Sequence, residues 1–585
     1  MERTFMEKST FYKVISAILS IVLVATAAFF MFQVAKMNIL PGKFFILASI
    51  ILGLLIAILL LLQNLAAQRK VARFFSTLLL LLNCFVLIVG NLYINQTDQF
   101  IQKVTDNTGK NKSTVAMIVL KENEAEKVKD LDGMKIGSLK EIDKTGTKKM
   151  FSDLDKKGIS YKKKKYTALT EQVQDLYDGK IDAMVLNEGY RHNIEEFDQF
   201  RDFSDKTKVV HNVTYFVEKN NTANAVSDVT QKPFTIFISG NDSYGTIDEL
   251  TRSDVNMLVT VNPQTSTVLL TSIPRDFYVP LVCSDGACAQ GALDKLTHTG
   301  MHGIDTTRET LEDLLGVDIN YTFRVNFSSA EQIVDALGGV DITVEPGLEI
   351  ESFGADGALG GLEAGTHHLE GKRALAFARE RYSYEDGDVQ RVKNQQQVLE
   401  AIVHKAISSD TLSNYSTLLK SMEGAFETNM SQEEISALIQ YQLNENPKWK
   451  FENYVLNGQG ETMFCAELGQ GASVLVPDQR TIDIAKKKID AVMDGKSSKT
   501  IKEDLDEAIE YPAYMEGVEP VEIPVEEVVE EPIVESQQPV VDYSQQYYDP
   551  NQYQVYTPQP ETNSETPTTQ QYVDPSLYQE PVQSY

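Results

Sequence analysis

The sequence predicts an α/β protein with three N-terminal transmembrane helices, a small α/β domain, a larger layered α-β-α sandwich domain and a disordered acidic tail. Three observations lead to this fold class. Three apolar runs of about twenty residues open the chain. Strand-like and helix-like patterns then alternate up to about residue 500, and after residue 511 the composition changes to Pro, Gln, Tyr and Glu.

The charge of the chain is unevenly distributed. The net charge is −29, from 54 basic and 83 acidic side chains. No Lys or Arg follows Lys502, whereas 19 acidic residues do, so residues 1–502 carry a net charge of −10. An acidic chain without a basic block is poorly suited to binding nucleic acid, and we predict no nucleic-acid partner. Four Cys residues in 585 also exclude a disulfide-built scaffold.

The first element is a membrane anchor, predicted over residues 14–95. The runs 14–35, 44–62 and 74–92 are each long enough to cross a bilayer as a helix. Three basic residues precede the first run and three separate the second from the third, whereas the loop between the first two holds only two. The positive-inside rule therefore places residues 1–13 in the cytoplasm and the rest of the chain, from about residue 95, outside the cell membrane.

The second element, residues 97–232, is predicted to be a small α/β accessory domain. A strand-like run covers 115–120, another covers 134–138, and 176–186 is typical of a helix end followed by a buried strand. The stretches DLDGMKIGS and DGKIDAMVL resemble half of a periplasmic solute-binding lobe. The run Lys162–Lys165 is interpreted as a solvated edge.

The third element, residues 233–500, is predicted to be a layered α/β sandwich. Residues 234–239 and 255–261 are apolar enough to be central strands covered on both faces, and 268–273 is a third strand. Further patterns predict helices over 306–315, 329–337, 373–381 and 389–407, and a strand over 340–344. The tail, 511–585, holds 11 of the 19 Pro residues and no basic residue, which predicts a disordered spacer.

Two carboxylates stand at one edge of the predicted sheet. Asp242 follows the strand 234–239, and Asp254 directly precedes the strand 255–261. Together they could hold Mg²⁺, a hard ion that takes oxygen ligands and shares them with phosphate. The alternative is that both carboxylates are helix caps or partners of Arg252 and Arg275.

Several guanidinium groups follow further along the chain. Arg379 and Arg381 flank an acidic turn together with Arg391, and Gln395 lies one helical turn after Arg391 on the same face. Converging guanidinium groups suit a pyrophosphate, whose oxygens they bind in pairs. The alternative is a surface network with the neighbouring acids Glu380, Glu385 and Asp386.

Residues 233–410 resemble the extracytoplasmic catalytic domain of the LytR-CpsA-Psr family. The three spans followed by an accessory domain are similar to the capsule-associated branch of that family. The stretches that carry the resemblance are GNDSYG, RSDVNMLVTVNPQTSTVLLTSIPRDFYVPL, DKLTH, FSSAEQIVDALGGVDITV, LEAGTHHLEGKRALAFARER and GDVQRVKNQQQVLEAI.

The resemblance implies a phosphotransferase of a Gram-positive cell envelope. Such an enzyme moves a phosphate-linked glycopolymer, a capsular polysaccharide or teichoic acid, from undecaprenyl pyrophosphate to peptidoglycan. Asp242 and Asp254 match its Mg²⁺ positions. Its pyrophosphate-binding positions match Arg252, Arg275, Arg379, Arg381, Arg391 and Gln395.

The catalytic candidates are Arg275, Asp276, Arg379 and Arg381. Asp276 either orients Arg275 or takes the proton of the acceptor hydroxyl, and the sequence does not decide between these roles. One position departs from the family, which usually has Arg where this chain has Asn394. Two other functions fit the same residues: a polyprenyl-pyrophosphate hydrolase, or a non-catalytic regulator that binds the lipid carrier.

The remaining candidates concern the lipid slot and the cysteines. One wall of a slot for the lipid carrier is offered by Ile333, Val334, Leu337, Val398, Leu399, Ile402 and Val403. The alternative, which the sequence favours for each residue taken singly, is that these side chains are plain core. Cys283 and Cys288 can form a disulfide within one loop, or Cys465 can pair with either of them. No histidine-based metal site is expected.

Overall fold

The computed structural model describes residues 2–521, apart from 66–69, 106–109, 220–222, 242–246, 285, 287, 355–356, 385–386, 407, 409–423 and 506–507. Three candidate residues, Asp242, Glu385 and Asp386, therefore lie outside the described residues, as does the predicted tail from residue 522.

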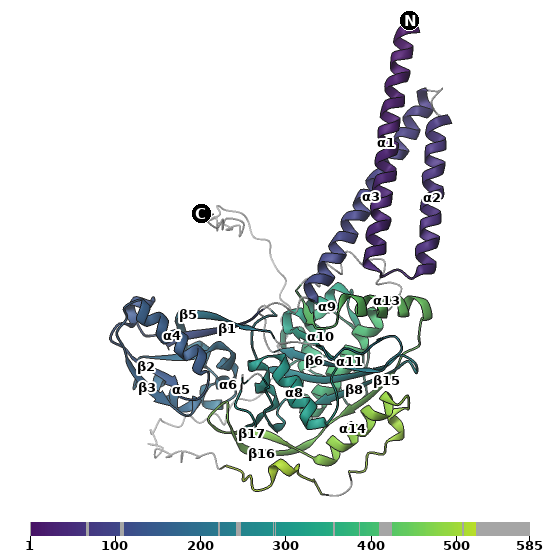
Figure 1. The fold of residues 1–585 in the computed structure, drawn as a ribbon. Helices are drawn as coiled ribbons and strands as arrows, with labels where there is room; N and C mark the ends of the chain where they lie inside the picture. Colours follow the sequence, from purple (N-terminus) through teal and green to yellow (C-terminus); the bar gives the residue numbers. More distant parts are fainter. Residues whose placement is uncertain are drawn as a thin grey trace, which may run out of the picture. The chain divides into compact units, whose positions relative to one another are not determined.

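The chain begins with three long helices, α1 (Glu2–Met37), α2 (Gly42–Leu65) and α3 (Lys70–Val104), which are drawn in Figure 1. Their stretches Val14–Met37, Gly42–Leu65 and Val71–Gln99 are long and apolar enough to cross a membrane. Most of these apolar side chains are exposed, as expected of a surface that meets lipid rather than water.

The accessory domain contains a five-stranded sheet in the order β3-β2-β4-β1-β5. The basic run Lys162–Lys165 lies in the edge strand β3, with three of its four side chains exposed, so its interpretation as a solvated edge is confirmed. The strands are β1 (Lys110–Leu120), β2 (Lys135–Leu139), β3 (Lys162–Tyr166), β4 (Ala183–Asn187) and β5 (Thr207–Glu218). The helices are α4 (Lys144–Lys156), α5 (Leu169–Tyr177), α6 (Arg191–Glu195) and α7 (Phe203–Lys206).

The larger domain is built on a six-stranded sheet in the order β14-β11-β6-β7-β8-β15. The predicted strands β6 and β7 are central, and β6, β7 and β8 pair antiparallel, whereas β11 and β15 add to this meander in parallel. The strands are β6 (Phe234–Asn241), β7 (Ser253–Asn262), β8 (Thr267–Ile273), β11 (Tyr321–Asn326), β14 (Phe426–Thr428) and β15 (Lys450–Val455).

Helices cover both faces of this sheet, as the sequence predicted (Figure 1). Because side chains alternate along a strand, Phe237 packs in the cluster formed with α8 (Ile304–Leu315) and α14 (Gln479–Met493). The next residue, Ile238, packs on the opposite face near Leu399 of α11 (Gly387–Ala406). On that face α9 (Phe327–Ala336) also packs against α11.

The other elements surround this sandwich. They are β9 (Tyr278–Pro280), β10 (Leu293–Lys295), β12 (Val340–Val344), β13 (Gly365–Leu369), α10 (Gly371–Arg379), α13 (Gln432–Glu445), β16 (Gly458–Cys465) and β17 (Gln470–Pro477). The predicted helices and the strand 340–344 all appear within about three residues of their predicted bounds.

The disordered tail predicted from residue 511 begins too early. Over residues 511–521 the chain packs on the larger domain: Tyr514 donates a hydrogen bond to the carbonyl of Tyr278 at 3.0 Å, and Met515 is buried. The prediction was wrong here because Pro and acidic residues dominate the composition, while Tyr514, Met515 and Val518 supply the apolar surface that packs in a hydrophobic cluster.

The accessory domain and the β16–β17 hairpin share one hydrophobic core. Leu169 and Ile194 of the accessory domain belong to the same buried cluster as Met463 and Val474 of the hairpin. At its margin the Tyr190 hydroxyl donates to a carboxylate oxygen of Glu467 at 2.5 Å. The accessory domain is therefore packed against the larger domain rather than tethered to it.

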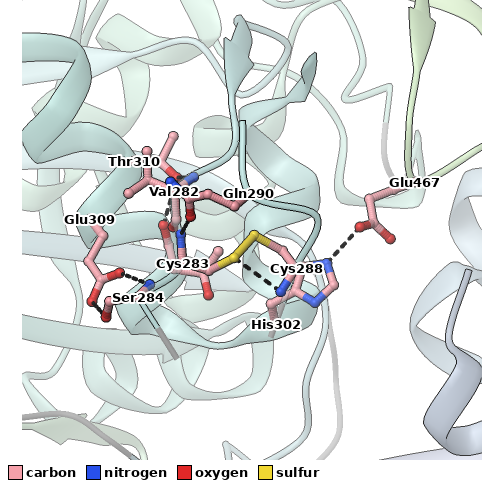
Figure 2. Close-up of a disulfide and its surroundings, with 10 residues drawn as sticks. Val282, Cys283, Ser284, Cys288, Gln290, His302, Glu309, Thr310 and Glu467 are labelled. Atoms are coloured by element: carbon pink, nitrogen blue, oxygen red, sulfur yellow. Dashed lines mark hydrogen bonds and ion pairs between the residues drawn. A yellow bond between two sulfur atoms is a disulfide. The ribbon is translucent and has the colours of Figure 1, made fainter. Parts of the chain in front are cut away.

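Cys283 and Cys288 form a disulfide, so of the two pairings left open by the sequence the one within the loop is confirmed (Figure 2). Cys465 is free and buried. The loop is also held by hydrogen bonds, from the N–H of Cys283 to Gln290 at 2.8 Å and from the N–H of Ser284 to Glu309 at 2.7 Å. Closing so short a loop stabilises the fold by about 2 kcal/mol in the chain-entropy view.

The buried pair His302–Glu467 predicts a pH-dependent stability (Figure 2). Burial would lower the pKa of His302, but its 2.9 Å hydrogen bond to Glu467 and the charge of that carboxylate raise it above its usual value. Burial would raise the pKa of Glu467, but His302 and Tyr190 lower it. The pair therefore stabilises the fold fully between about pH 4.3 and pH 6.5, and the contribution of His302 is lost as the pH rises through its raised pKa.

We expect His302→Gln to lower the melting temperature of the full chain in detergent by roughly 2–4 °C at pH 6. The difference from the wild type should shrink as the pH rises through the raised pKa of His302, because the imidazole then loses its charge. The measurement is a series of thermal melts of both proteins from pH 6 upwards. A difference that does not change with pH would contradict the prediction.

Candidate functional site

The candidate site is a cavity of about 530 Å³ at one edge of the six-stranded sheet. At this edge β6, β8 and β11 end and the antiparallel β7 begins, so loops from four strands meet there. Of the predicted metal and pyrophosphate positions, all that the structure describes line this cavity: Arg252, Asp254, Arg275, Arg379, Arg381, Arg391 and Gln395. Residues separated by more than 140 positions are thus brought together.

Asp254 lies among the arginines at one end of the cavity, which we call the charged end. One carboxylate oxygen lies 3.0 Å from Nη1 of Arg275 and 3.8 Å from Nη2 of Arg252. The other accepts a 2.9 Å hydrogen bond from the Thr297 hydroxyl. Burial would raise the pKa of Asp254, but the charges of Arg275, Arg252 and Arg391 lower it well below its usual range. The carboxylate is therefore ionised, and its predicted alternative role as a partner of both arginines is confirmed.

Asp276 lies beside Arg275 and faces a buried lysine. Its carboxylate is 3.5 Å from Nε of Arg275 and 3.3 Å from Nζ of Lys295. Burial would raise the pKa of Asp276, but Lys295, Arg275 and Arg391 lower it to about 2. Of its two predicted roles, this environment favours orienting Arg275, because a carboxylate of such low pKa is a weak base.

The second group of cations comes from the end of α10, the loop after it and α11. Arg379 is the last residue of α10 and lies 4.2 Å from the centre of the Phe327 ring, and Arg381 donates a 2.8 Å hydrogen bond to the Tyr382 hydroxyl. Arg391 and Gln395 of α11 both line the cavity, so their predicted common face is confirmed.

Glu380, a member of the alternative surface network, is buried instead of solvated. Its carboxylate accepts backbone hydrogen bonds from Gly354 at 2.6 Å and from Tyr382 at 2.8 Å. Glu380 thereby fixes the loop that carries Arg381. These hydrogen bonds of Glu380 therefore hold the backbone from which Arg379 and Arg381 reach the cavity.

The apolar end of the cavity contains part of the predicted lipid wall. Val398, Leu399 and Ile402 line it. Ile333, Val334 and Leu337 are instead buried in hydrophobic clusters, as the alternative of plain core predicted. The cavity thus joins a cationic end to an apolar one formed by three of the seven candidates and by neighbours such as Met257.

Three site residues were missed by the sequence reasoning. Lys295, the last residue of β10, approaches Asp276, and Thr297, two residues later, approaches Asp254; the quoted stretch DKLTH was a signal for both. Glu196, from the accessory domain, contacts Arg252 and Arg275, and no sequence signal pointed to it.

Asn394, the position where the family usually has Arg, faces away from the arginines of the cavity. It is buried, donates to the Phe377 carbonyl at 3.1 Å and to the Tyr384 hydroxyl at 3.2 Å, and accepts from Gln390 at 3.0 Å. This asparagine therefore joins α10 to α11. An arginine at the same backbone position would need a different environment.

His298 and His302 have structural roles. His298 bonds to Asp294 at 2.5 Å and to Asn193 at 3.0 Å, and His302 bonds to Glu467. Among the described residues no three His, Cys, Asp or Glu side chains form a group suited to a metal ion. Mg²⁺ does not require such a group, because it is usually bound by one or two carboxylates and by the oxygens of a phosphate.

Fold and cavity together define an α/β protein with three helices long and apolar enough to cross a membrane and with a cavity lined by arginines at one end and by aliphatic side chains at the other. The chain belongs to the LytR-CpsA-Psr family: the model described as LytR_cpsA_psr family matches residues 203–490. A second model, NMT1/THI5 like, matches residues 101–230, which comprise most of the accessory domain.

Two relatives illustrate the family. The polyisoprenyl-teichoic acid–peptidoglycan teichoic acid transferase TagU of Bacillus mycoides is 32% identical over 262 residues, 44% of this chain and 79% of the relative. TagU of Bacillus cereus strain AH820 is 32% identical over 260 residues, 44% of this chain and 78% of the relative. Among solved structures, TagT bound to LI-WTA is 28% identical with a TM-score of 0.37, covering 47% of this chain and 96% of that one.

Proposed function

We propose that the chain is a glycopolymer–peptidoglycan phosphotransferase that takes its glycopolymer from undecaprenyl pyrophosphate. The observation that carries the proposal is the lining of one cavity by Arg252, Arg275, Arg379, Arg381 and Arg391 at one end and by aliphatic side chains at the other. Such a cavity suits a diphosphate esterified to a polyprenyl chain. The names of the family relatives, which are teichoic acid transferases, support the same reaction.

In this proposal the acceptor is a sugar hydroxyl of peptidoglycan. Its oxygen attacks the phosphorus next to the glycopolymer, a new P–O bond forms, and the P–O bond to undecaprenyl phosphate breaks. The hydroxyl proton passes to a base, and undecaprenyl phosphate leaves with the bridging oxygen. The reaction depends on holding the two phosphates in line and neutralising their oxygens, which a set of guanidinium groups does without changing protonation state.

Mg²⁺ is part of the proposal. Asp254, with an ionised carboxylate at the cavity wall, would hold the ion together with Asp242 and the phosphate oxygens. The ion would supply additional neutralisation of charge on the transferring phosphate. Arg275 and Thr297 orient the carboxylate of Asp254 for this purpose.

The test uses the full chain in detergent with Mg²⁺, a polyprenyl-pyrophosphate-linked glycan and peptidoglycan oligomers, with products read by mass spectrometry. A phosphodiester-linked glycan on the acceptor supports the proposal. Polyprenyl phosphate with free glycan phosphate, formed in the presence of excess acceptor, would replace it with a hydrolase. Tight binding of the donor without turnover would replace it with a non-catalytic regulator.

A further inference from the structure

The accessory domain places one carboxylate inside the cavity of the larger domain. Glu196 directly follows α6 and lies outside residues 203–490, the part of the chain matched by the family model. One of its carboxylate oxygens is 2.5 Å from Nη1 of Arg252 and 3.1 Å from Nη2 of Arg275. The other is 3.7 Å from Nζ of Lys295. A single anionic oxygen thus bridges two guanidinium groups.

This arrangement is the one that a phosphate oxygen adopts between two arginines. Arg252 is buried and Arg275 is largely so, with side-chain exposures of 6% and 12%. A carboxylate and a phosphate oxygen cannot use the same N–H groups at the same time. Glu196 therefore occupies a position that a bound diphosphate would need.

Because Glu196 is negatively charged, it competes with a phosphate for the N–H groups of Arg252 and Arg275. Burial would raise the pKa of Glu196, but the charges of Arg252, Lys295 and Arg275 lower it. With Glu196 in place the cluster formed by Arg252, Arg275 and Lys295 meets three carboxylates, those of Asp254, Asp276 and Glu196. Without it the same three cations meet only two carboxylates.

The backbone that carries Glu196 is fixed, whereas its side chain is partly exposed to solvent. On α6, Asn193 is buried and bonds to His298 of the larger domain at 3.0 Å, and Tyr190 just before the helix bonds to Glu467. The Glu196 side chain keeps 32% exposure, so it can rotate towards solvent without moving the helix. Displacement by a ligand requires only this rotation.

We propose that Glu196 is an internal counter-ion of the site, which a diphosphate ligand must displace, so that the accessory domain sets the affinity of the catalytic cavity. The identity of the ligand rests on the proposed function; the contact itself does not. The accessory domain then lowers ground-state binding of the donor and prevents other phosphates from occupying the empty site.

The test compares the full chain in detergent with its Glu196→Gln and Glu196→Ala variants. The probe is farnesyl pyrophosphate with Mg²⁺, and the dissociation constant is measured by calorimetry. We expect Glu196→Gln to bind the probe roughly 10- to 100-fold more tightly, a gain of about 1.4–2.7 kcal/mol. Glu196→Ala should change in the same direction, and thermal melts of both variants show whether they are folded.

Glu188→Gln is the matched control. Glu188 lies in the same domain with a similar exposure, 26%, and pairs with Arg191 at 2.6 Å, outside the cavity lining. Its variant removes the same charge and should bind the probe within twofold of the wild type. Equal tightening by Glu188→Gln would show a general charge effect and would overturn the inference.

The remaining outcomes separate this inference from the proposed function. Unchanged or weaker binding by Glu196→Gln, with wild-type binding intact, overturns the inference and leaves the proposed function standing; weaker binding would make Glu196 a residue that positions the arginines. Tighter binding without any glycan transfer supports the inference and contradicts the proposed function. Failure of every form to bind the diphosphate overturns both.

Discussion

Arg275→Ala is expected to reduce the rate of glycopolymer transfer by about 10²- to 10³-fold, the usual cost of removing one preorganised group that stabilises developing oxygen charge. Arg275 contacts Asp254 at 3.0 Å, Asp276 at 3.5 Å and Glu196 at 3.1 Å, so it connects three carboxylates. The measurement is the initial rate of formation of the glycan–peptidoglycan product at saturating donor.

Two further variants make this prediction specific. Arg275→Lys keeps the positive charge and loses the planar fork, so it should recover only a small part of the lost rate. Arg201→Ala removes an arginine that is 77% exposed in the accessory domain and should leave the rate unchanged. Full activity of Arg275→Lys would show that charge alone is needed, contrary to the proposed bidentate binding of phosphate.

Asp254→Asn should have an effect of similar size, about 10²-fold or more on the transfer rate. The substitution keeps the shape of the side chain but removes the anion that faces Arg252 and Arg275 and that we propose as a ligand of Mg²⁺. The rate is measured over a range of Mg²⁺ concentrations. A metal ligand lost at this position raises the Mg²⁺ concentration needed for half-maximal rate by at least about tenfold.

The control for this variant is Asp494→Asn. Asp494 is 66% exposed and pairs with Lys496, far from the cavity lining in the sequence and outside it in the structure. Its variant should keep both the rate and the Mg²⁺ dependence of the wild type. An Asp254→Asn enzyme with a low rate but unchanged Mg²⁺ dependence would assign Asp254 to orienting the arginines and not to the metal.

Local patterns predicted the framework of the site correctly. The strands 234–239 and 255–261 are rich in apolar residues, which identifies central strands, and their ends give the edge where Asp254 lies. Arg391 and Gln395 share a helix face by their spacing of four alone. These features depend on neighbours within a few residues, which a sequence displays directly.

Contacts between distant segments could not be predicted in this way. Glu196 reaches Arg252 and Arg275 across 56 and 79 positions, through the packing of two domains. The apolar periodicity of α9 and α11 shows which face of each helix is apolar but not what covers it. Leu399 of α11 therefore lines the cavity, whereas Ile333 of α9, equally apolar, packs in the interior.

The hydrophobic core shared by the accessory domain and the β16–β17 hairpin has a consequence for building chimaeric proteins. A cut near residue 230 would separate Leu169 and Ile194 from Met463 and Val474 and leave both halves with an apolar surface facing water. Exchanging accessory domains between relatives therefore calls for exchanging the hairpin as well. The two segments, about 270 positions apart at Ile194 and Met463, make up one transplantable piece.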